Sequence, residues 1–294
     1  MRRLGSYEME DLKRITLENI DDLTNEERTM LEDRLQYMDQ EVRKYIENRD
    51  PLRYMRAYRT ILMYMTQTLT DDIKNAIEAS NFGRDGRSTG VIHPSGIKGC
   101  TLRNIWKLTE SGEKASVNVW LEMLADVGTA IHIVEQTYLL DMFDDAFYPE
   151  LRIGDSVFAQ ENGIDGHADG ILTLTFPTFV VDVNVEIKTV GKDKITKIVN
   201  GPLNDHKDQS IIYMKSLDTP YVLFLYVSRD DGKMRSQFYR FDDRRFNKLQ
   251  KKIDTVNSLA GEEISPAKRE ALAQPSYFDC KDCEFSKACP KRKE

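Results

Sequence analysis

Charged and amide side chains alternate with apolar ones along residues 180–188, which read Val-Val-Asp-Val-Asn-Val-Glu-Ile-Lys. Because side chains alternate across a β-strand, this segment is predicted to bury its odd-numbered aliphatic residues and to present Glu186 and Lys188 on the other face. The segment 163–170 places Asp169 at the start of another predicted strand. Two carboxylates on adjacent strands beside a lysine can hold a hard divalent cation and position water for attack on a phosphodiester.

A Glu-X-Lys strand is weak evidence on its own, since ion pairs on a solvated sheet face are common and contribute little stability. The lysine would also lower the pKa of nearby carboxylates and help to orient a nucleophile. How strongly this strand indicates a catalytic site therefore depends on which other motifs accompany it in the sequence.

A helix is predicted over residues 119–142, because apolar residues recur there at three- and four-residue spacing. This stripe consists of Trp120, Leu124, Val127, Ile131, Val134 and Tyr138. Gly128, His132 and Glu135 follow a neighbouring line of the same helix. Taken alone, His132 would be interpreted as a core histidine.

Further strands and helices are predicted in the second half of the chain. Strands are expected at about 151–160, 167–176, 179–188, 221–228 and 234–241, and helices at about 206–217 and 242–260. Gln209 and Tyr213 share one face of the first of these helices. Helices on both sides of a strand-rich middle indicate an α/β fold with a mixed central sheet flanked by helices.

The first 80 residues are rich in helix-forming residues and are predicted to form several helices. The glycine-rich polar segment 81–90 is predicted to be a linker. We therefore expect a helical N-terminal extension over residues 1–90 and a second domain over 91–294.

Four short motifs together resemble the RecB-like branch of the PD-(D/E)XK nucleases in order and approximate spacing. They are Gly128-Thr-Ala-Ile-His132, Asp169 after Gly166, Glu186-Ile-Lys188 and Gln209-Ser-Ile-Ile-Tyr213. The resemblance covers residues 91–290 and implies a restriction-endonuclease-like fold. The leading 90 residues lie outside it.

The resemblance also implies roles for individual residues. His132, Asp169 and Glu186 would ligate Mg²⁺ or Mn²⁺ with help from the carbonyl of Ile187, and Lys188 would be the catalytic lysine. Gln209 and Tyr213 would lie beside the catalytic centre near the DNA backbone. The alternative is that both residues belong to the ordinary surface and core of their helix.

Three other acidic residues are weaker candidates. Asp165 precedes the matched aspartate in a loop, and Asp182 fits the strand motif less well than Glu186 does. Glu135, one turn beyond His132, is a candidate for a residue that hydrogen-bonds to a metal ligand without binding the metal itself.

Three of the four cysteines lie close together in the sequence. Cys280, Cys283 and Cys289 have the spacing C-x₂-C-x₅-C, and Cys100 is the only other cysteine. Thiolates suit both Zn²⁺ and iron–sulfur clusters, so the ligand type leaves both open. One cysteine far upstream and three near the C-terminus resemble the arrangement in the [4Fe–4S] nucleases related to RecB, such as the AddB nuclease domain. The resemblance implies that the four cysteines hold a cluster and that a C-terminal iron–sulfur segment closes the nuclease domain.

The 294 residues include 42 Lys and Arg against 49 Asp and Glu, giving a formal net charge of −7. This balance argues against a protein that coats nucleic acid or anionic membranes by overall charge. Contact with DNA would therefore need a local basic surface, and residues 188–215 supply six lysines against three aspartates. Trp106, Tyr213 and Phe285 are the aromatic candidates for stacking on single-stranded bases.

No apolar run approaches the ~20 residues of a membrane helix, and the first residues lack the apolar core of a signal peptide. We therefore expect a cytoplasmic protein, of a bacterial or phage-infected cell, without membrane contact. Four cysteines are too few for a disulfide scaffold. No G-x-x-x-x-G-K-[ST] phosphate loop is present, so a helicase or recombination protein would be a separate partner, and a homo-oligomer is a further option.

The leading hypothesis is a metal-dependent DNA exonuclease that acts on single-stranded or end-resected DNA in recombination, repair or phage DNA metabolism. One alternative is a structure- or site-specific endonuclease on the same fold. Another is a non-catalytic DNA-binding or assembly module with a structural zinc site, against which the joint presence of Asp169, Glu186 and Lys188 argues.

Overall fold

The computed structural model describes residues 12–48, 90–109, 119–199, 201–273, 280 and 283–291. The chain divides into two compact units. The sheet unit comprises residues 1–49, 132–153 and 167–242, and the cysteine unit comprises residues 50–131, 154–166 and 243–294. Within the described parts, no helix is both long and apolar enough to cross a membrane.

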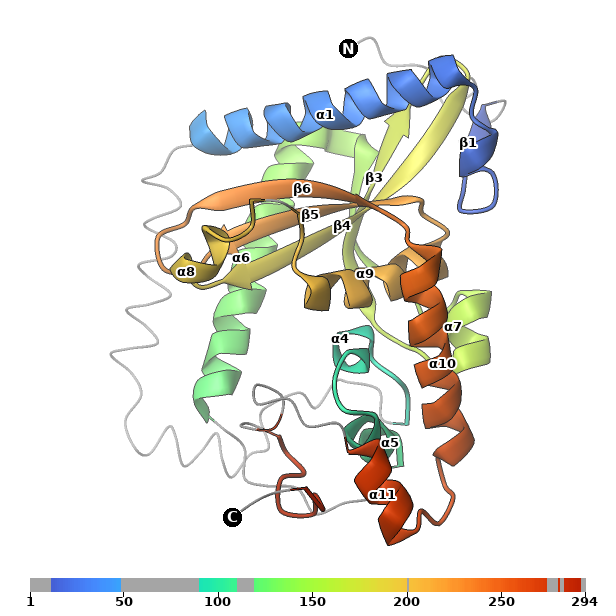
Figure 1. Cartoon of the computed structure of the whole chain (residues 1–294). Helices are drawn as coiled ribbons and strands as arrows, with labels where there is room; N and C mark the ends of the chain where they lie inside the picture. The colour runs from blue at the N-terminus through green and yellow to red at the C-terminus, as the bar shows by residue number, and fades with distance from the viewer. Residues whose placement is uncertain are drawn as a thin grey trace. The chain divides into compact units, whose positions relative to one another are not determined.

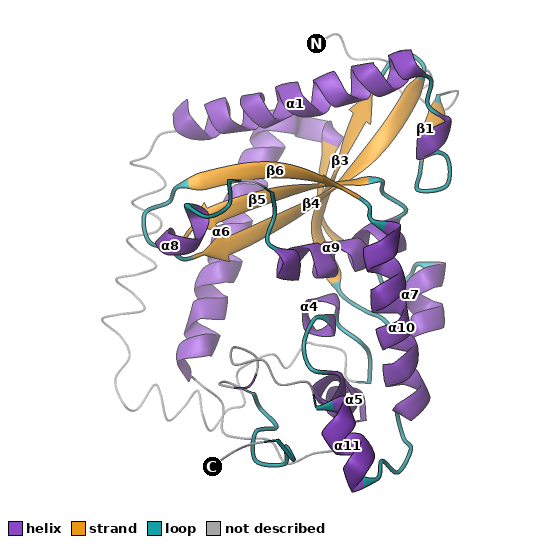
Figure 2. Ribbon diagram, viewed as in Figure 1, coloured by secondary structure: helices purple, strands orange, loops and turns teal. Residues whose placement is uncertain are grey.

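The sheet unit contains a mixed sheet with the strand order β2-β3-β4-β5-β6, and β1 pairs separately with β4 (Figures 1 and 2). The strands are β1 (Lys13–Ile15), β2 (Phe147–Arg152), β3 (His167–Thr175), β4 (Phe179–Val190), β5 (Tyr221–Ser228) and β6 (Met234–Arg240). Strand β4 runs parallel to β5 and β1 and antiparallel to β3. The longest strand is therefore paired along both of its edges.

Helix α9 (Asn204–Leu217) connects the parallel strands β4 and β5. A parallel pair needs such a crossover, which also covers one face of the sheet. Met214 of α9 packs with Val222, Phe224 and Tyr226 of β5, together with Ile195 at the end of α8 (Lys192–Ile195). Helices α8 and α9 thus cover one face of β5, and every residue of this strand is buried.

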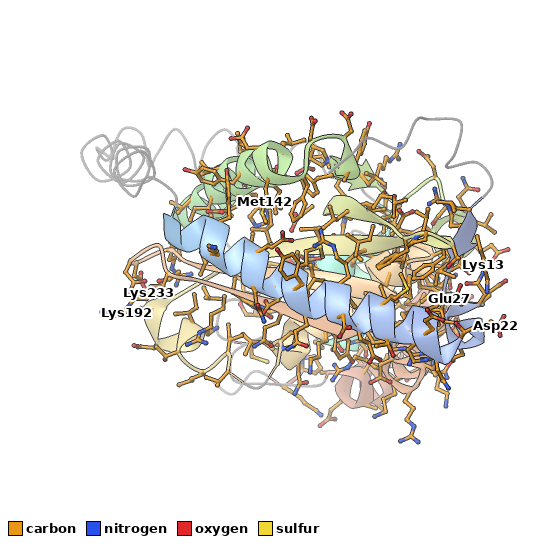
Figure 3. All side chains as sticks on the ribbon, turned by 90° about the horizontal axis from the view of Figure 1, so that it is seen from above. Lys13, Asp22, Glu27, Met142, Lys192 and Lys233 are labelled. Atoms are coloured by element: carbon orange, nitrogen blue, oxygen red, sulfur yellow. The ribbon has the colours of Figure 1, made fainter. Side chains whose placement is uncertain are left out.

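Helix α1 (Asn25–Asn48) lies across the opposite face of the sheet from α8 and α9 (Figure 1). Its apolar residues recur at three- and four-residue spacing and are buried, as in an amphipathic helix on a core. They are Leu31, Leu35, Met38 and Val42. The hydroxyl of Ser236 in β6 donates to the carboxylate of Asp39, which fixes the helix against the sheet. Figure 3 looks down on this helix.

The cysteine unit is mostly helical within its described residues. Its helices are α4 (Pro94–Ile97), α5 (Thr101–Thr109), α7 (Val157–Asn162), α10 (Asp243–Leu259) and α11 (Pro266–Leu272), and it includes the first part of α6 (Val119–Phe143). Helix α10 packs against α4, α5 and α7. An isolated bridge between Ile92 and Ile164 joins the segments that precede α4 and follow α7.

The predicted fold class, an α/β protein with a mixed central sheet flanked by helices, is confirmed. The strand expected at about 151–160 is wrong, because β2 ends at Arg152 and α7 begins at Val157. Ser156 explains the difference, since its hydroxyl accepts the N–H of Ala159 and caps the helix.

The N-terminal part of the chain differs from the all-helical expectation, because Lys13–Ile15 forms a strand. Arg14 and Ile15 pair with Val180 and Val181, on a stretch of β4 that precedes its pairing with β5. Residues 49–89 lie outside the described residues, so the boundary near residue 90 stays a prediction.

Gly170 provides a test of how closely β2 approaches β3. A Cβ atom at this position would lie 2.4 Å from Phe147 Cε2 and 3.0 Å from the carbonyl oxygen of Tyr148. We expect Gly170→Ala to lower the free energy of unfolding in urea by about 1–3 kcal/mol, as other overpacked positions do. The control is Gly96→Ala, whose new Cβ would make only an ordinary contact at 3.5 Å. Equal stability of the two variants would contradict the close approach.

Candidate active site

Strands β3 and β4 bring two carboxylates together. The antiparallel register pairs Gly170 with Val185, which sets Asp169 and Glu186 at neighbouring positions on the same face. Oδ2 of Asp169 accepts the main-chain N–H of Ile187 at 2.6 Å. The side chain of Asp169 is 14% exposed and that of Glu186 is 1% exposed. Both carboxylates are therefore held in a site with little water.

The Glu186 carboxylate contacts Lys188 and Ser210, and Gln209 contacts Lys188 in turn. The ammonium group of Lys188 forms an ion pair with Glu186 and donates to Oε1 of Gln209 at 2.8 Å. The hydroxyl of Ser210 donates to Oε2 of Glu186 at 3.3 Å. These contacts attach α9 to β4 at Glu186 and Lys188.

Gln209 also contacts Tyr213, one turn further along α9. Nε2 of Gln209 donates to the hydroxyl of Tyr213 at 3.4 Å. Lys188, Gln209 and Tyr213 thus form a chain of polar contacts on the face of the sheet that α9 covers.

His132 reaches Asp169 from the C-terminal half of α6. Its Nδ1 lies 3.2 Å from Oδ1 of Asp169. An ionised carboxylate only accepts hydrogen bonds, so Nδ1 carries the proton in this contact. The two oxygens of Asp169 are then occupied by His132 and by the N–H of Ile187.

The surroundings shift two pKa values in the site. Burial raises the pKa of Glu186 to about 7, and the charge of Asp169 adds to this effect, while Lys188 and His132 oppose it. Burial alone would lower the pKa of His132, but the hydrogen bond and the charge of Asp169 outweigh burial and raise it. Additional positive charge near Glu186 would favour its ionised form.

The donors fit a hard divalent cation by type, although they do not form a finished site. Oxygen ligands suit Mg²⁺ and Mn²⁺, and a buried carboxylate with a raised pKa gains from a nearby cation. In the part of the chain that the structure describes, no three His, Cys, Asp or Glu side chains are gathered closely enough to hold a metal ion. Lys188 neutralises Glu186 in this arrangement.

The structure brings the predicted site residues of the sheet unit into one network, which consists of His132, Asp169, Glu186, Lys188, Gln209 and Tyr213. Asp182 lies elsewhere on β4, where it pairs with Arg14 and accepts the hydroxyl of Thr173. Asp165 belongs to the cysteine unit.

Sequence analysis missed three residues that contact this network. Ser210 binds Glu186, and Gln136 binds both the main-chain oxygen of Asp169 and the carboxylate of Glu150. Gln136 lies four residues after His132, so helical spacing is a signal that could have identified it. Glu135, which was singled out instead, is buried.

The four cysteines lie in the cysteine unit and form no disulfide. Cys100, Cys283 and Cys289 pack against a buried cluster of Leu102, Trp106, Ala273 and Phe285. Burial raises the pKa of the Cys283 thiol, and Cys100 lies close enough to add to the effect. Cys280 is exposed. Three of the four thiols therefore share one environment, which fits a metal centre held by this set, but the four are not gathered into a finished site.

Ion pairs join the C-terminal segment to α5 beside these cysteines. Glu284 accepts from Arg103 at 3.3 Å and from Lys107 at 2.8 Å, and these two cations lower the pKa of Glu284 against the effect of burial. Trp106 and Phe285 contact each other with their ring centroids 5.4 Å apart. Both candidate stacking aromatics of this unit are buried, which corrects their predicted contact with DNA bases.

No family model matches this sequence. No curated protein matches it either. Among solved structures, the chain is similar to SSO0001, with a TM-score of 0.46 and 18% identity, over 76% of this chain and 98% of that chain. It is also similar to the alkaline exonuclease LHK-Exo from Laribacter hongkongensis, with a TM-score of 0.45 and 15% identity, over 62% of this chain and 94% of that chain. A structure of LHK-Exo in complex with dAMP gives the same values.

The raised pKa of Glu186 predicts how the stability of the metal-free protein depends on pH. The folded protein holds this proton up to about pH 7, whereas an unperturbed glutamate loses it near 4.5. The free energy of unfolding should therefore fall between these values by up to about 3 kcal/mol. Glu186→Gln should remove this part of the slope, measured by urea unfolding in EDTA from pH 5 to 8.

The control for this measurement is Glu270→Gln, which replaces an exposed glutamate of α11. It should keep the wild-type slope. An unchanged slope in Glu186→Gln would mean that the buried carboxylate does not resist ionisation.

Proposed function

We propose that this protein is a divalent-metal-dependent deoxyribonuclease, acting as an exonuclease on single-stranded or end-resected DNA. The observation that carries the proposal is the meeting of Asp169, Glu186 and Lys188 on adjacent strands, with His132 bound to Asp169. Carboxylates and a lysine in this combination suit the hydrolysis of phosphodiester bonds. The sequence motifs favour the same activity.

Asp169, Glu186, the carbonyl of Ile187 and His132 would hold Mg²⁺ or Mn²⁺. When bound, the ion supplies a polarised phosphate oxygen and a water of lowered pKa. Lys188 would stabilise negative charge on the phosphate and orient the nucleophile. Gln209 holds the ammonium group of Lys188 in place, and Ser210 holds the carboxylate of Glu186.

Exposed lysines after β4 support binding of the DNA backbone. Lys192, Lys194 and Lys197 are exposed, while Ile195 and Ile198 between them are buried in the core of the sheet unit. Lys192 and Lys233 lie toward the same end of the sheet (Figure 3). Contacts of this kind bind phosphates without reading sequence, and they weaken as salt rises.

The cysteines belong to the proposal as ligands of a [4Fe–4S] cluster. Cys100, Cys280, Cys283 and Cys289 would hold it, and the shared environment of three of them supports this assignment. Thiolate ligands equally suit zinc, so the metal has to be determined directly. In either case the centre would tie α5 to the C-terminal segment.

Lys188→Ala tests the nuclease. Removing the ammonium group should lower the rate of cleavage of linear single-stranded DNA with Mn²⁺ by about 100-fold or more, and EDTA should abolish cleavage by the wild-type protein. The control is Lys268→Ala, an exposed lysine of α11, which should keep wild-type activity. Cleavage of circular DNA would show that the protein is an endonuclease and not an exonuclease. Equal activity of Lys188→Ala and wild type would contradict the proposed site.

Cys283→Ala tests the cluster. In protein purified without oxygen, this variant should lose bound iron and melt at a lower temperature, because a metal centre contributes to folding. Ser286→Ala, in the same turn of the chain, is the control. If the wild-type protein contains zinc and no iron, the four cysteines form a zinc site and not an iron–sulfur cluster. Unchanged metal content in Cys283→Ala would exclude this cysteine as a ligand.

A further inference from the structure

Strand pairing between β2 and β3 is irregular opposite Asp169. Pro149 pairs with Gly170 and has no N–H to donate, and the next pair is Leu151 with Ala168. Glu150, between the two pairs, has a φ of 54°, which is uncommon for a residue other than glycine. Such backbone conformations persist only where surrounding contacts maintain them.

Gln136 supplies a contact at this irregular position. Its Nε2 donates to the main-chain oxygen of Asp169 at 2.9 Å and to Oε1 of Glu150 at 2.7 Å. The residue is only 6% exposed. An amide nitrogen has two hydrogens, so these two acceptors use its full donor capacity.

Glu150 determines which way the Gln136 amide points. A glutamine amide has a donor end and an acceptor end of almost the same shape. The carboxylate of Glu150 and the carbonyl of Asp169 both accept hydrogen bonds, so only the nitrogen end of Gln136 satisfies both. Without the carboxylate, this preference would be weaker.

We propose that Gln136, oriented by Glu150, is a positioning residue that holds Asp169 in place for the metal site of the proposed function. Gln136 follows His132 by one helical turn, so α6 contacts Asp169 through its carboxylate and through its main chain. Fixing the main chain fixes the direction in which the carboxylate leaves β3. The inference rests on the proposed function for its catalytic consequence, but not for its geometry.

Two variants separate positioning from ordinary packing. Gln136→Leu removes both hydrogen bonds. The exchange Gln136→Glu with Glu150→Gln lets the two side chains bond again with donor and acceptor reversed, but leaves no donor for the carbonyl of Asp169. Thr137→Ala, an exposed neighbour on α6, is the control.

The first readout is the ¹⁵N signal of the His132 imidazole in metal-free protein, assigned with His132→Gln. Wild type and Thr137→Ala should show a hydrogen-bonded Nδ1, and in both test variants the signal should shift toward that of free imidazole. Both test variants should remain folded, which a cooperative melting transition would show. A wild-type His132 signal in both folded test variants would overturn the inference.

The second readout is the Mn²⁺ concentration that gives half-maximal cleavage of single-stranded DNA. It should rise about tenfold or more in both test variants, as when partners that support metal ligands are lost elsewhere. Cleavage at saturating Mn²⁺ should approach the wild-type rate, and an unchanged Mn²⁺ requirement would contradict the inference. If the wild-type protein cleaves no DNA, the proposed function fails, and the His132 signal still decides whether Gln136 positions Asp169.

Discussion

The burial of the Glu186 carboxylate is the constraint on which the rest of the sheet unit depends. A charge with so little contact with water is costly unless it is paired and hydrogen-bonded. The compensation comes from Lys188 on the same strand and Ser210 on α9, while the nearby Asp169 adds negative charge. Lys188 and Ser210 therefore favour the ionised form of Glu186, whereas burial and the charge of Asp169 oppose it. An added cation would favour the ionised form.

The connection between β4 and β5 makes this burial possible. Because the two strands are parallel, the chain must cross over between them, and α9 returns over the face that carries Glu186 and Lys188. The antiparallel strand β3 brings Asp169 to the same face from the other edge. Pairing on both edges of β4 holds the two carboxylates at fixed positions, as a site that binds a small cation requires.

Strand alternation was enough to predict which face of β4 carries Glu186 and Lys188, because alternation depends on local spacing. That His132, Gln209 and Tyr213 would lie beside these residues was implied by the resemblance to a nuclease family, since spacing alone does not predict contacts between distant segments. The end of β2 was not predictable from apolar alternation over 151–160, since the Ser156 cap ends the extended segment. Gln136 could have been predicted from its spacing to His132. The role of Glu150 could not have been predicted, because its contact with Gln136 depends on the register of β2 on β3 and on a left-handed backbone conformation. The strand face that carries Glu186 was expected to be polar, and the structure shows that the crossover helix α9 covers it.

The most direct test of the account is the location of a bound divalent ion. Crystals of the protein soaked in Mn²⁺ should give an anomalous difference peak within coordination distance of the carboxylates of Asp169 and Glu186, and the peak should be absent in Glu186→Gln crystals treated identically. Such a peak would show that the buried carboxylates form a metal site. A peak only at other positions, or none in well-ordered wild-type crystals, would contradict the central claim.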